Sequence, residues 1–254
     1  MSEHNNKIVH PKDDYEVVSV IDWALAEQKK ISIEGQNSRS WLGFRDQAQP
    51  DAILKLNQLE GVVAYEPEEL FVALRPGTSV RMVRNLLQQQ GQMLAFDPVE
   101  FHEPSREQPT QGTVGGMVAS ALAGSRRLKS GSVRDHVLGF RAVSGRGELF
   151  KSGGRVVKNV TGYDLSKLMC GSYGTLAALT EVVLKTLPLP QADATAMFLA
   201  PDVRLASSFA RQAWRAPLDA SCFGFYPGTL PLAGEAYSGA WWVAVRVDGA
   251  AASL

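Results

Sequence analysis

The chain has 254 residues and carries 26 basic and 26 acidic side chains, so its formal net charge is zero. This balance argues against an overall field that would favour DNA, RNA or an anionic membrane as a partner. The polar start, MSEHNNKIVHPKDD, is not a secretory signal, and no apolar run approaches the ~20 residues of a membrane-spanning helix.

Residues 1–66 predict a small α/β unit. A helix is expected over residues 14–30, because apolar residues recur there at spacings of three and four. Its apolar stripe consists of Tyr15, Val18, Ile21 and Leu25. Short strands are expected at residues 31–33, 51–56 and 61–65, and the first of them ends at the glycine of a turn.

Residues 67–188 predict a second, larger unit. A buried strand at residues 70–74 ends in the turn Arg75-Pro76-Gly77, and a helix over residues 78–90 follows it. The helix is expected to turn Val80, Val83 and Leu87 inward. Further along we expect a strand at 93–96, a loop over 97–111, a short buried helix at 116–123, a hairpin at 137–150, a helix at 165–169 and a last strand at 180–186.

Two prolines, Pro188 and Pro190, mark the end of the larger unit. Residues 189–254 predict a short α/β cap region, with strands at 198–201 and 241–247 and a helix at 204–215. For the chain as a whole we expect an α+β fold.

A polar loop follows the first strand of the small unit. It consists of Gly35, Gln36, Asn37, Ser38, Arg39 and Ser40. Glycine permits a sharp reversal, asparagine and serine tolerate a turn and can hydrogen-bond an anion, and arginine can offset phosphate charge. Most loops of this composition are ordinary turns, so the loop alone is weak evidence for phosphate binding.

Three glycine-containing segments of the larger unit offer similar chemistry. Thr113-Val114-Gly115-Gly116-Met117 opens a helix of small residues, where glycines either expose amides to a ligand or allow a tight helix crossing. In Gly131-Ser132-Val133-Arg134-Asp135, Ser132 can meet a phosphate or ribose oxygen, whereas Arg134 and Asp135 can simply pair with each other. The turn Gly171-Ser172-Tyr173-Gly174-Thr175-Leu176 leads into a strand whose backbone can pair with the edge of a ring.

Several common cofactor sites are excluded. Gly145-Arg146-Gly147 lacks the third glycine and the following helix of a Rossmann fingerprint, and no Walker A lysine motif occurs. Only two cysteines are present, so a four-thiolate iron–sulfur cluster cannot form within the chain. A reducing cytosol is the simpler setting for so few thiols.

Taken together, the Gly35 loop, AFDP, TVGG, GSVRDHVLG and KNVTGYDLSKLMCGSYGTLAALTEVVLKTLP resemble the FAD-binding domain of the p-cresol methylhydroxylase and vanillyl-alcohol oxidase type. Within that type, residues 5–190 are similar to the family of FAD-binding E subunits of bacterial glycolate oxidases. The resemblance implies two α/β subdomains that clasp FAD, with a third region over the flavin.

The resemblance also implies a site, without identifying a catalytic residue. Gly35 to Ser40 would cradle the pyrophosphate, and Ser132 and Asp135 would lie near the ribityl chain or the flavin. Residues implied to line the cofactor are Thr113, Gly115, Gly116, Ser120 and Ala123. Residues implied to close the adenine side are Gly174, Thr175, Leu176 and Leu179.

Two departures concern the cofactor and the reaction. Covalent flavin linkage in such folds uses His, Cys or Tyr, and the Gly35 loop contains none, so we expect non-covalent FAD. The histidines are His4, His10, His102 and His136, and none lies in the C-terminal region. A His-ligated metal is therefore not expected there, and oxidation of a hydroxy acid with a general base of the chain's own is doubtful.

The resemblance implies a subunit of a complex that oxidises glycolate to glyoxylate. The chain would act as a redox relay or a stabilising partner beside a sister flavin subunit and an iron–sulfur subunit. It would be cytoplasmic, and peripheral at the inner membrane through those partners. Two alternatives stay open: an independent FAD-dependent alcohol or 2-hydroxy-acid oxidoreductase, and a structural subunit with a vestigial flavin site.

Overall fold

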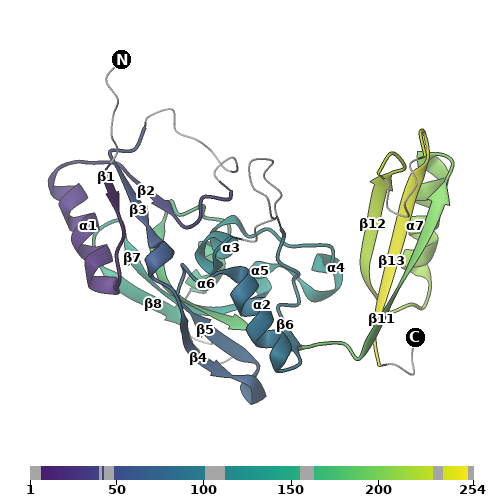
Figure 1. Ribbon diagram of the computed structural model, residues 1–254, viewed down its shortest axis with the longest axis horizontal. Helices are drawn as coiled ribbons and strands as arrows, with labels where there is room; N and C mark the ends of the chain where they lie inside the picture. Colours follow the sequence, from purple (N-terminus) through teal and green to yellow (C-terminus); the bar gives the residue numbers. More distant parts are fainter. Residues whose placement is uncertain are drawn as a thin grey trace. The chain divides into compact units, whose positions relative to one another are not determined.

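The computed structural model describes residues 7–39, 42, 49–100, 112–154, 163–230 and 237–250 (Figure 1). The chain forms two compact units. Unit 1 contains residues 1–94, 98–122 and 132–187, and unit 2 contains residues 95–97, 123–131 and 188–254. Two segments from the middle of the sequence therefore belong to the same unit as the C-terminal strands.

Unit 1 contains a small parallel sheet in the order β1-β3-β2. Its strands are β1 (Lys7–Val9), β2 (Ile31–Glu34) and β3 (Ala52–Lys55), and the 3-10 helix η1 (Leu56–Gln58) follows β3. Helix α1 (Asp14–Ala26) connects β1 to β2 and begins after Asp13, whose carboxylate accepts a hydrogen bond from the Glu16 amide. The predicted strand at residues 51–56 is thus confirmed as β3, whereas β1 was not predicted.

The apolar stripe predicted for α1 is only partly correct, because Ile21 is buried and Val18 packs against the core, whereas the other two members do not. Tyr15 and Leu25 are exposed, and the buried residues of the helix are Asp14, Val17, Ile21 and Ala24. A charged residue can occupy the inner face because the Asp14 carboxylate pairs with Arg75 at 2.9 Å and with Arg141 at 3.1 Å. A buried charge is tolerated when it is paired in this way.

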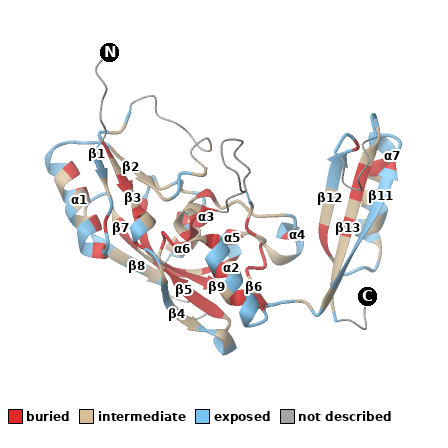
Figure 2. Ribbon diagram, in the orientation of Figure 1, coloured by how far each residue is buried: buried red, intermediate tan, exposed pale blue. Residues whose placement is uncertain are grey.

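A second, antiparallel sheet of unit 1 has the order β4-β5-β9-β7-β8. The strands are β4 (Val62–Glu66), β5 (Phe71–Leu74), β7 (Val137–Ser144), β8 (Leu149–Gly153) and β9 (Ala177–Lys185). Every residue of β5 is buried (Figure 2). The predicted boundary after residue 66 falls between β4 and β5, which pair with each other, and that boundary stays a prediction.

Short helices and strands complete unit 1. They are η2 (Pro67–Glu69), α2 (Val80–Gln89), β6 (Gln92–Met93), α3 (Val114–Ser120), α5 (Val133–His136), α6 (Leu165–Met169) and β10 (Leu187–Pro188), which ends at the first residue of unit 2. Helix α2 buries Val80, Val83 and Leu87, as predicted from their spacing. The strand predicted at residues 93–96 is shorter than expected, because only Gln92 and Met93 form it.

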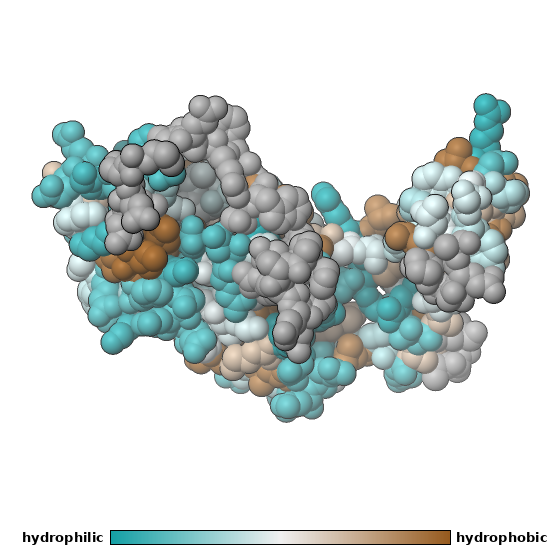
Figure 3. Space-filling model, turned by 45° about the horizontal axis from the view of Figure 1, so that its top comes forward, coloured by the Kyte–Doolittle hydropathy of each residue, from teal (hydrophilic) through white to brown (hydrophobic). Residues whose placement is uncertain are grey.

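Unit 2 contains an antiparallel sheet in the order β11-β13-β12. Its elements are α4 (Arg127–Ser130), β11 (Ala192–Ala200), α7 (Val203–Arg215), β12 (Ala220–Pro227) and β13 (Trp241–Gly249). Helix α7 packs on the sheet around a core that includes Ala206 and Val243. Nearly all of β11 is exposed (Figure 2), and apolar atoms reach the surface of unit 2 (Figure 3).

Two ion pairs join the segment 123–131 to β13 and to the residue before β12. Arg126 and Asp248 lie 2.7 Å apart, and both side chains are buried. Lys129 pairs with Asp219 at 2.7 Å nearer the surface. No helix in the described part of the chain has the length and apolar character needed to cross a membrane.

Candidate functional site

A cavity of about 710 Å³ opens in unit 1 where three separate segments meet. These segments are the loop after β2, the start of α3 and the turn between α6 and β9. A cavity of this volume is typical of small-molecule and cofactor sites. Of the residues predicted from the sequence, those that line it are Gly35, Gln36, Asn37, Ser38, Arg39, Thr113, Gly115, Gly116, Ser120, Gly174, Thr175 and Leu179.

The loop after β2 approaches the start of α3 closely. A Cβ atom on Gly35 would overlap the side chain of Thr113, so glycine is required for this approach. Asn37 adopts a left-handed conformation with φ of 54°, which asparagine tolerates better than most residues. The amides of Asn37 and Ser38 donate to no other group of the described chain, so they are available to an anion.

The amides of Val114 and Gly115, in the first turn of α3, donate hydrogen bonds within the protein and are not available to a ligand. The Val114 amide donates to the Thr78 carbonyl at 2.9 Å, and the Gly115 amide donates to the Pro76 carbonyl at 2.8 Å. The sequence left two interpretations of these glycines open, and for Gly115 the structure supports close packing. A Cβ atom there would lie 2.9 Å from the Pro76 Cβ.

Gly116 differs from its neighbour because it has room on the cavity side. Its amide donates to the Thr113 hydroxyl, which caps the helix, at 3.3 Å. A Cβ atom on Gly116 would meet Thr113 and Arg39 only at ordinary contact distances of 3.4 and 3.5 Å. The surface that Gly116 presents to the cavity is therefore bare backbone.

Arg39 places a positive charge in the cavity wall. Burial lowers the pKa of its guanidinium to about 10, so the group remains protonated at neutral pH. Its Nη2 donates to the Val99 carbonyl at 3.4 Å. A Cβ atom on Gly112, whose φ is 73°, would press against Arg39 Nη1 and Ser38 Oγ, so glycine at 112 gives these two side chains their space.

The turn between α6 and β9 is fastened to the end of α3. Gly171 donates its amide to the Val118 carbonyl at 3.2 Å, and Tyr173 donates its amide to the Ala119 carbonyl at 2.9 Å. The turn therefore holds a fixed position relative to α3. Tyr173 lines the cavity and was quoted in the sequence motif, but it was not predicted as a site residue.

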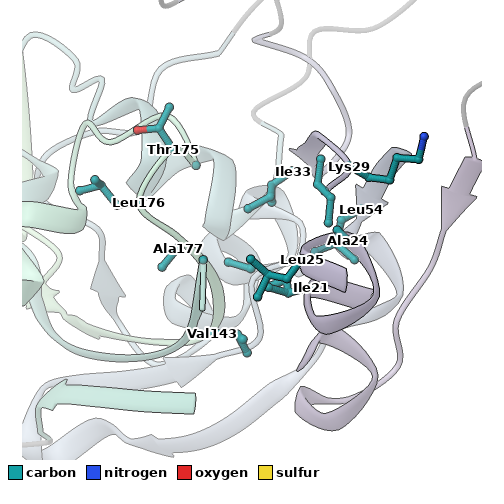
Figure 4. A pocket seen from close by; sticks show the side chains of 14 residues that line it. Ile21, Ala24, Leu25, Lys29, Ile33, Leu54, Val143, Thr175, Leu176 and Ala177 are labelled. Atoms are coloured by element: carbon teal, nitrogen blue, oxygen red, sulfur yellow. The ribbon is translucent and has the colours of Figure 1, made fainter. Parts of the chain in front are cut away.

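A smaller cavity of about 200 Å³ has walls in common with the larger one. The residues that line both are Ile31, Ile33, Gly174, Thr175 and Ala177. Figure 4 shows Ile21 and Leu25 of α1 near Leu54, with Thr175, Leu176 and Ala177 across the space. The predicted residue Leu176 lines this apolar cavity.

Five predicted residues are not placed along the larger cavity, and one of them is Leu176, which lines only the smaller cavity. Ser132 and Asp135 form a capping box at the start of α5, in which the Asp135 carboxylate accepts from the Ser132 amide at 2.7 Å and from its hydroxyl at 2.9 Å. These hydrogen bonds lower the pKa of Asp135. Ala123 belongs to unit 2, and Ser40 lies outside the described residues.

Sequence reasoning missed most of the apolar wall. Ile31, Ile33, Pro76, Ala119 and Ala177 line the cavity, but they look like ordinary strand, turn and helix residues. The alternation Ile31-Ser32-Ile33 was the available signal, because it places both isoleucines on one face of β2. In the described ranges, no group of three or more His, Cys, Asp or Glu residues is positioned to hold a metal ion.

The residues fit a phosphorylated planar cofactor. Two free amides and a guanidinium lie along one segment of the wall, bare backbone lies at Gly116, and apolar side chains extend to the smaller cavity. Amides and arginine recognise phosphate oxygens, and apolar walls with few polar groups accept aromatic rings. Among the described residues of the larger cavity, Glu34 supplies the one carboxylate.

Comparison with known proteins gives the same assignment. Residues 6–153 match the family model of the FAD binding domain. Glycolate oxidase subunit GlcE of Escherichia coli (strain K12) is 43% identical over 173 residues, which are 68% of this chain and 47% of that protein. D-lactate dehydrogenase of Anaerostipes hadrus is 30% identical over 185 residues, 72% of this chain and 37% of that protein.

Glycolate oxidase subunit GlcD of Bacillus subtilis (strain 168) is 25% identical over 193 residues, 76% of this chain and 39% of that protein. The chain thus spans less than half the length of these three relatives. A solved structure of alkyldihydroxyacetonephosphate synthase aligns with a TM-score of 0.75 at 19% identity, over 97% of this chain and 47% of that one.

The structural likeness confirms the predicted α+β fold of the p-cresol methylhydroxylase type. The family model covers more than half of the sequence and includes the loop after β2 and the start of α3. The chain therefore belongs to the FAD-binding domain family, and FAD is its cofactor.

Proposed function

We propose that the chain holds FAD without a covalent bond in the 710 Å³ cavity and serves as the FAD-binding subunit of an enzyme that oxidises glycolate to glyoxylate. The observation that carries this proposal is the meeting of three distant segments around one cavity with phosphate-binding groups on its wall. The 43% identity to a glycolate oxidase subunit supports the substrate.

Within this proposal, the loop after β2 binds the pyrophosphate. The amides of Asn37 and Ser38 donate to phosphate oxygens, and Arg39 offsets their charge. Gly116 allows the cofactor to approach the backbone, and the apolar walls contact the ring systems. Bound FAD supplies the capacity to accept a hydride or electrons, while the residues of the chain bind and orient it.

The predicted contacts of Ser40, Ala123, Ser132 and Asp135 with the cofactor stay predictions. So do Leu176 and the other residues of the adenine side, although Leu176 lines an apolar cavity that adjoins the larger one. An apolar recess beside a phosphate-binding loop suits an adenine ring, which supports placing the adenine at Gly174 to Leu179.

The proposal includes the arrangement of a complex. The chain acts beside a sister flavin subunit and an iron–sulfur subunit, either as a redox relay or as a stabilising partner. Its similarity to both GlcE and GlcD, each named as a subunit, supports an assembly of several chains. The proposed location is the cytoplasm, at the inner membrane through the partner subunits.

The first test is cofactor binding by the purified chain. FAD titration should produce a flavoprotein absorbance spectrum, and acid precipitation should release all of the flavin into the supernatant. Arg39→Ala should weaken FAD binding by about tenfold to a hundredfold, the loss of one charge-assisted contact. The exposed arginine of the β7–β8 hairpin, Arg146, supplies a matched control, and Arg146→Ala should leave binding unchanged. Absence of binding by the unmodified chain would overturn the proposal.

The second test is activity in the complex. The chain is produced with and without the other two subunits, and dye reduction is measured with glycolate. Activity should require all subunits, and the Arg39→Ala complex should regain activity at high FAD. Activity that persists without this chain would exclude it from the glycolate-oxidising unit.

Two observations favour the alternatives. The 30% identity to a D-lactate dehydrogenase favours an independent oxidoreductase, which would oxidise glycolate or D-lactate with a dye as the isolated chain. The internal hydrogen bonds of the α3 amides favour a structural subunit with a vestigial site. A complex that assembles and is fully active with no flavin on this chain would establish the structural role.

A further inference from the structure

Tyr173 stands out among the residues of the larger cavity. Of the described residues that line it, Tyr173 is the one with an aromatic ring. The residue is 45% exposed, so it gains little from burial in the protein itself. The residue therefore contributes less to the core than a tyrosine of the interior does.

The backbone at Tyr173 is unfavourable for this residue type. Its φ is 52°, in the left-handed region where bulky side chains are rare. Gly171 and Gly174 on either side also have positive φ, at 83° and 75°. The hydrogen bond from the Tyr173 amide to the Ala119 carbonyl holds the turn in this shape.

Glycine would adopt the same conformation without steric cost. A large side chain that is strained in the backbone and poorly buried needs another reason to be present, and strained residues cluster at ligand sites. The place of Tyr173 in the cavity wall supplies that reason. Planar heteroaromatic rings stack on aromatic side chains, and such contacts contribute substantially to binding.

We propose that the Tyr173 ring stacks on one of the two planar ring systems of the bound dinucleotide, either the adenine or the isoalloxazine. This inference rests on the proposed binding of FAD in the cavity. The turn at residues 171–174 is pinned to α3, so the backbone that carries the ring is held in place before the cofactor arrives. Tyr173 is thus a cofactor-contacting residue whose conformational cost is offset only when the cofactor is bound.

The test compares Tyr173→Gly, Tyr173→Phe and a matched control, Ala121→Gly. Ala121 also has φ of 52° and follows α3, but it does not line the cavity. Both glycine variants relieve backbone strain, so the melting temperature of the cofactor-free protein should not fall in either. FAD affinity should fall about tenfold to a hundredfold in Tyr173→Gly alone. Tyr173→Phe should bind FAD within about threefold of the unmodified chain, because the ring is retained.

Titrations with ADP and with FMN identify the stacked ring. If the ring contacts the adenine, Tyr173→Gly weakens ADP binding and leaves FMN binding unchanged; contact with the isoalloxazine gives the reverse. Unchanged FAD affinity in Tyr173→Gly, or an equal loss in Tyr173→Phe, overturns the stacking role. Failure of the unmodified chain to bind FAD is a different result, which overturns the proposed function and the stacking role together.

Discussion

An inner strand of unit 1 and an edge strand of unit 2 differ sharply in how far they are buried. Strand β9 of unit 1 and strand β11 of unit 2 both have nine residues, but seven are buried in β9 and only Ala200 is buried in β11. Strand β9 lies between two neighbours, whereas β11 is at an edge. Met197, Phe198 and Leu199 of β11 are consecutive, large and apolar, and all three are exposed.

This contrast separates two kinds of role. Unit 1 buries its strands β5 and β9 almost completely and keeps a cavity whose walls come from several elements, as a ligand site requires. Unit 2 leaves apolar side chains on an edge strand, and surfaces of that kind are typical of interaction sites. We therefore expect changes in unit 1 to affect the cofactor, and changes in unit 2 to affect stability or assembly with little effect on cofactor binding.

The largest effect is expected from breaking the buried ion pair of unit 2. Asp248→Ala leaves the Arg126 guanidinium buried without its carboxylate, and loss of one partner of such a pair costs roughly 3–5 kcal/mol. Urea unfolding followed by tryptophan fluorescence should show unit 2 unfolding early, since Trp214, Trp241 and Trp242 all belong to it. FAD affinity, measured below that transition, should be unchanged.

The exposed ion pair of the same segment is the control. Lys129→Ala breaks a pair whose Asp219 side chain is 83% exposed, so the cost should be below about 1 kcal/mol. An equal cost for both variants would mean that burial does not determine the strength of these pairs. Loss of FAD binding in Asp248→Ala would contradict the separation of roles.

A second, smaller effect distinguishes two adjacent glycines in unit 1. Gly115→Ala places a methyl group against Pro76, and such overpacking costs about 1–3 kcal/mol of unfolding free energy. Gly116→Ala meets only ordinary contacts and removes a helix glycine, so stability should be unchanged or higher by up to about 1 kcal/mol. Chemical denaturation of the cofactor-free protein measures both.

The same pair of variants tests the cavity. Because Gly116 presents bare backbone to the cofactor, Gly116→Ala should weaken FAD binding while the fold is retained. Equal stability in the two variants would show that Gly115 is not needed for packing. Equal FAD affinity in Gly116→Ala and the unmodified chain would show that the cofactor does not approach this part of α3.

Local patterns predicted much of the fold because they reflect local physics. The spacing of Val80, Val83 and Leu87 identified the buried face of α2, because residues three and four apart lie on the same face of a helix. For α1 the helix and the burial of Ile21 were predicted correctly, but the burial of Asp14 was not, because it depends on two arginines that are distant in sequence. Strand β12 was missed because Gly224 and Pro227 are uncommon in strands.

The polar loop of the site was predictable from the sequence, but the hydrogen-bond acceptors of α3 and the apolar walls of the cavity were not. Glycine, asparagine, serine and arginine mark the loop after β2 by composition alone. The amides of α3, however, are bound by Pro76 and Thr78, which lie far back in the sequence. The motif TVGG does not predict which carbonyl groups accept hydrogen bonds from these amides. The apolar walls escaped notice for a similar reason, since Ile31 and Ile33 resemble any half-buried strand.

A third effect tests whether Ser132 serves α5 or the cofactor. Ser132→Ala removes a hydroxyl of the capping box and should cost about 1 kcal/mol at pH 7. The low pKa of Asp135, caused mainly by the Ser132 amide, gives stability that is present above the ordinary carboxyl pKa and lost as pH falls through the lower folded value. Unfolding curves between pH 3 and 7 should therefore converge for the variant and the unmodified chain at the acid end.

The measured FAD affinity completes that test. Since the hydroxyl and the carboxylate bind each other, Ser132→Ala should leave FAD affinity unchanged. A clear fall in the FAD affinity of Ser132→Ala would instead support the predicted contact of these residues with the ribityl chain or the flavin. Asp135→Asn, which should lose the same stability, is the reference for the effect of breaking the capping box.

The smallest signal comes from the two cysteines, one in each unit. Burial raises the pKa of Cys170 to about 11, so at pH 8 about one thiol in a thousand is ionised and alkylation should be slow. Cys222 is buried in the sheet of unit 2. In Asp248→Ala, mass spectrometry of labelled peptides should show Cys222 reacting first, while Cys170 stays protected. Labelling of both cysteines at the same rate would mean that the two units unfold together. In that case the greater burial of β9 in unit 1 would not make unit 1 more resistant to unfolding than unit 2.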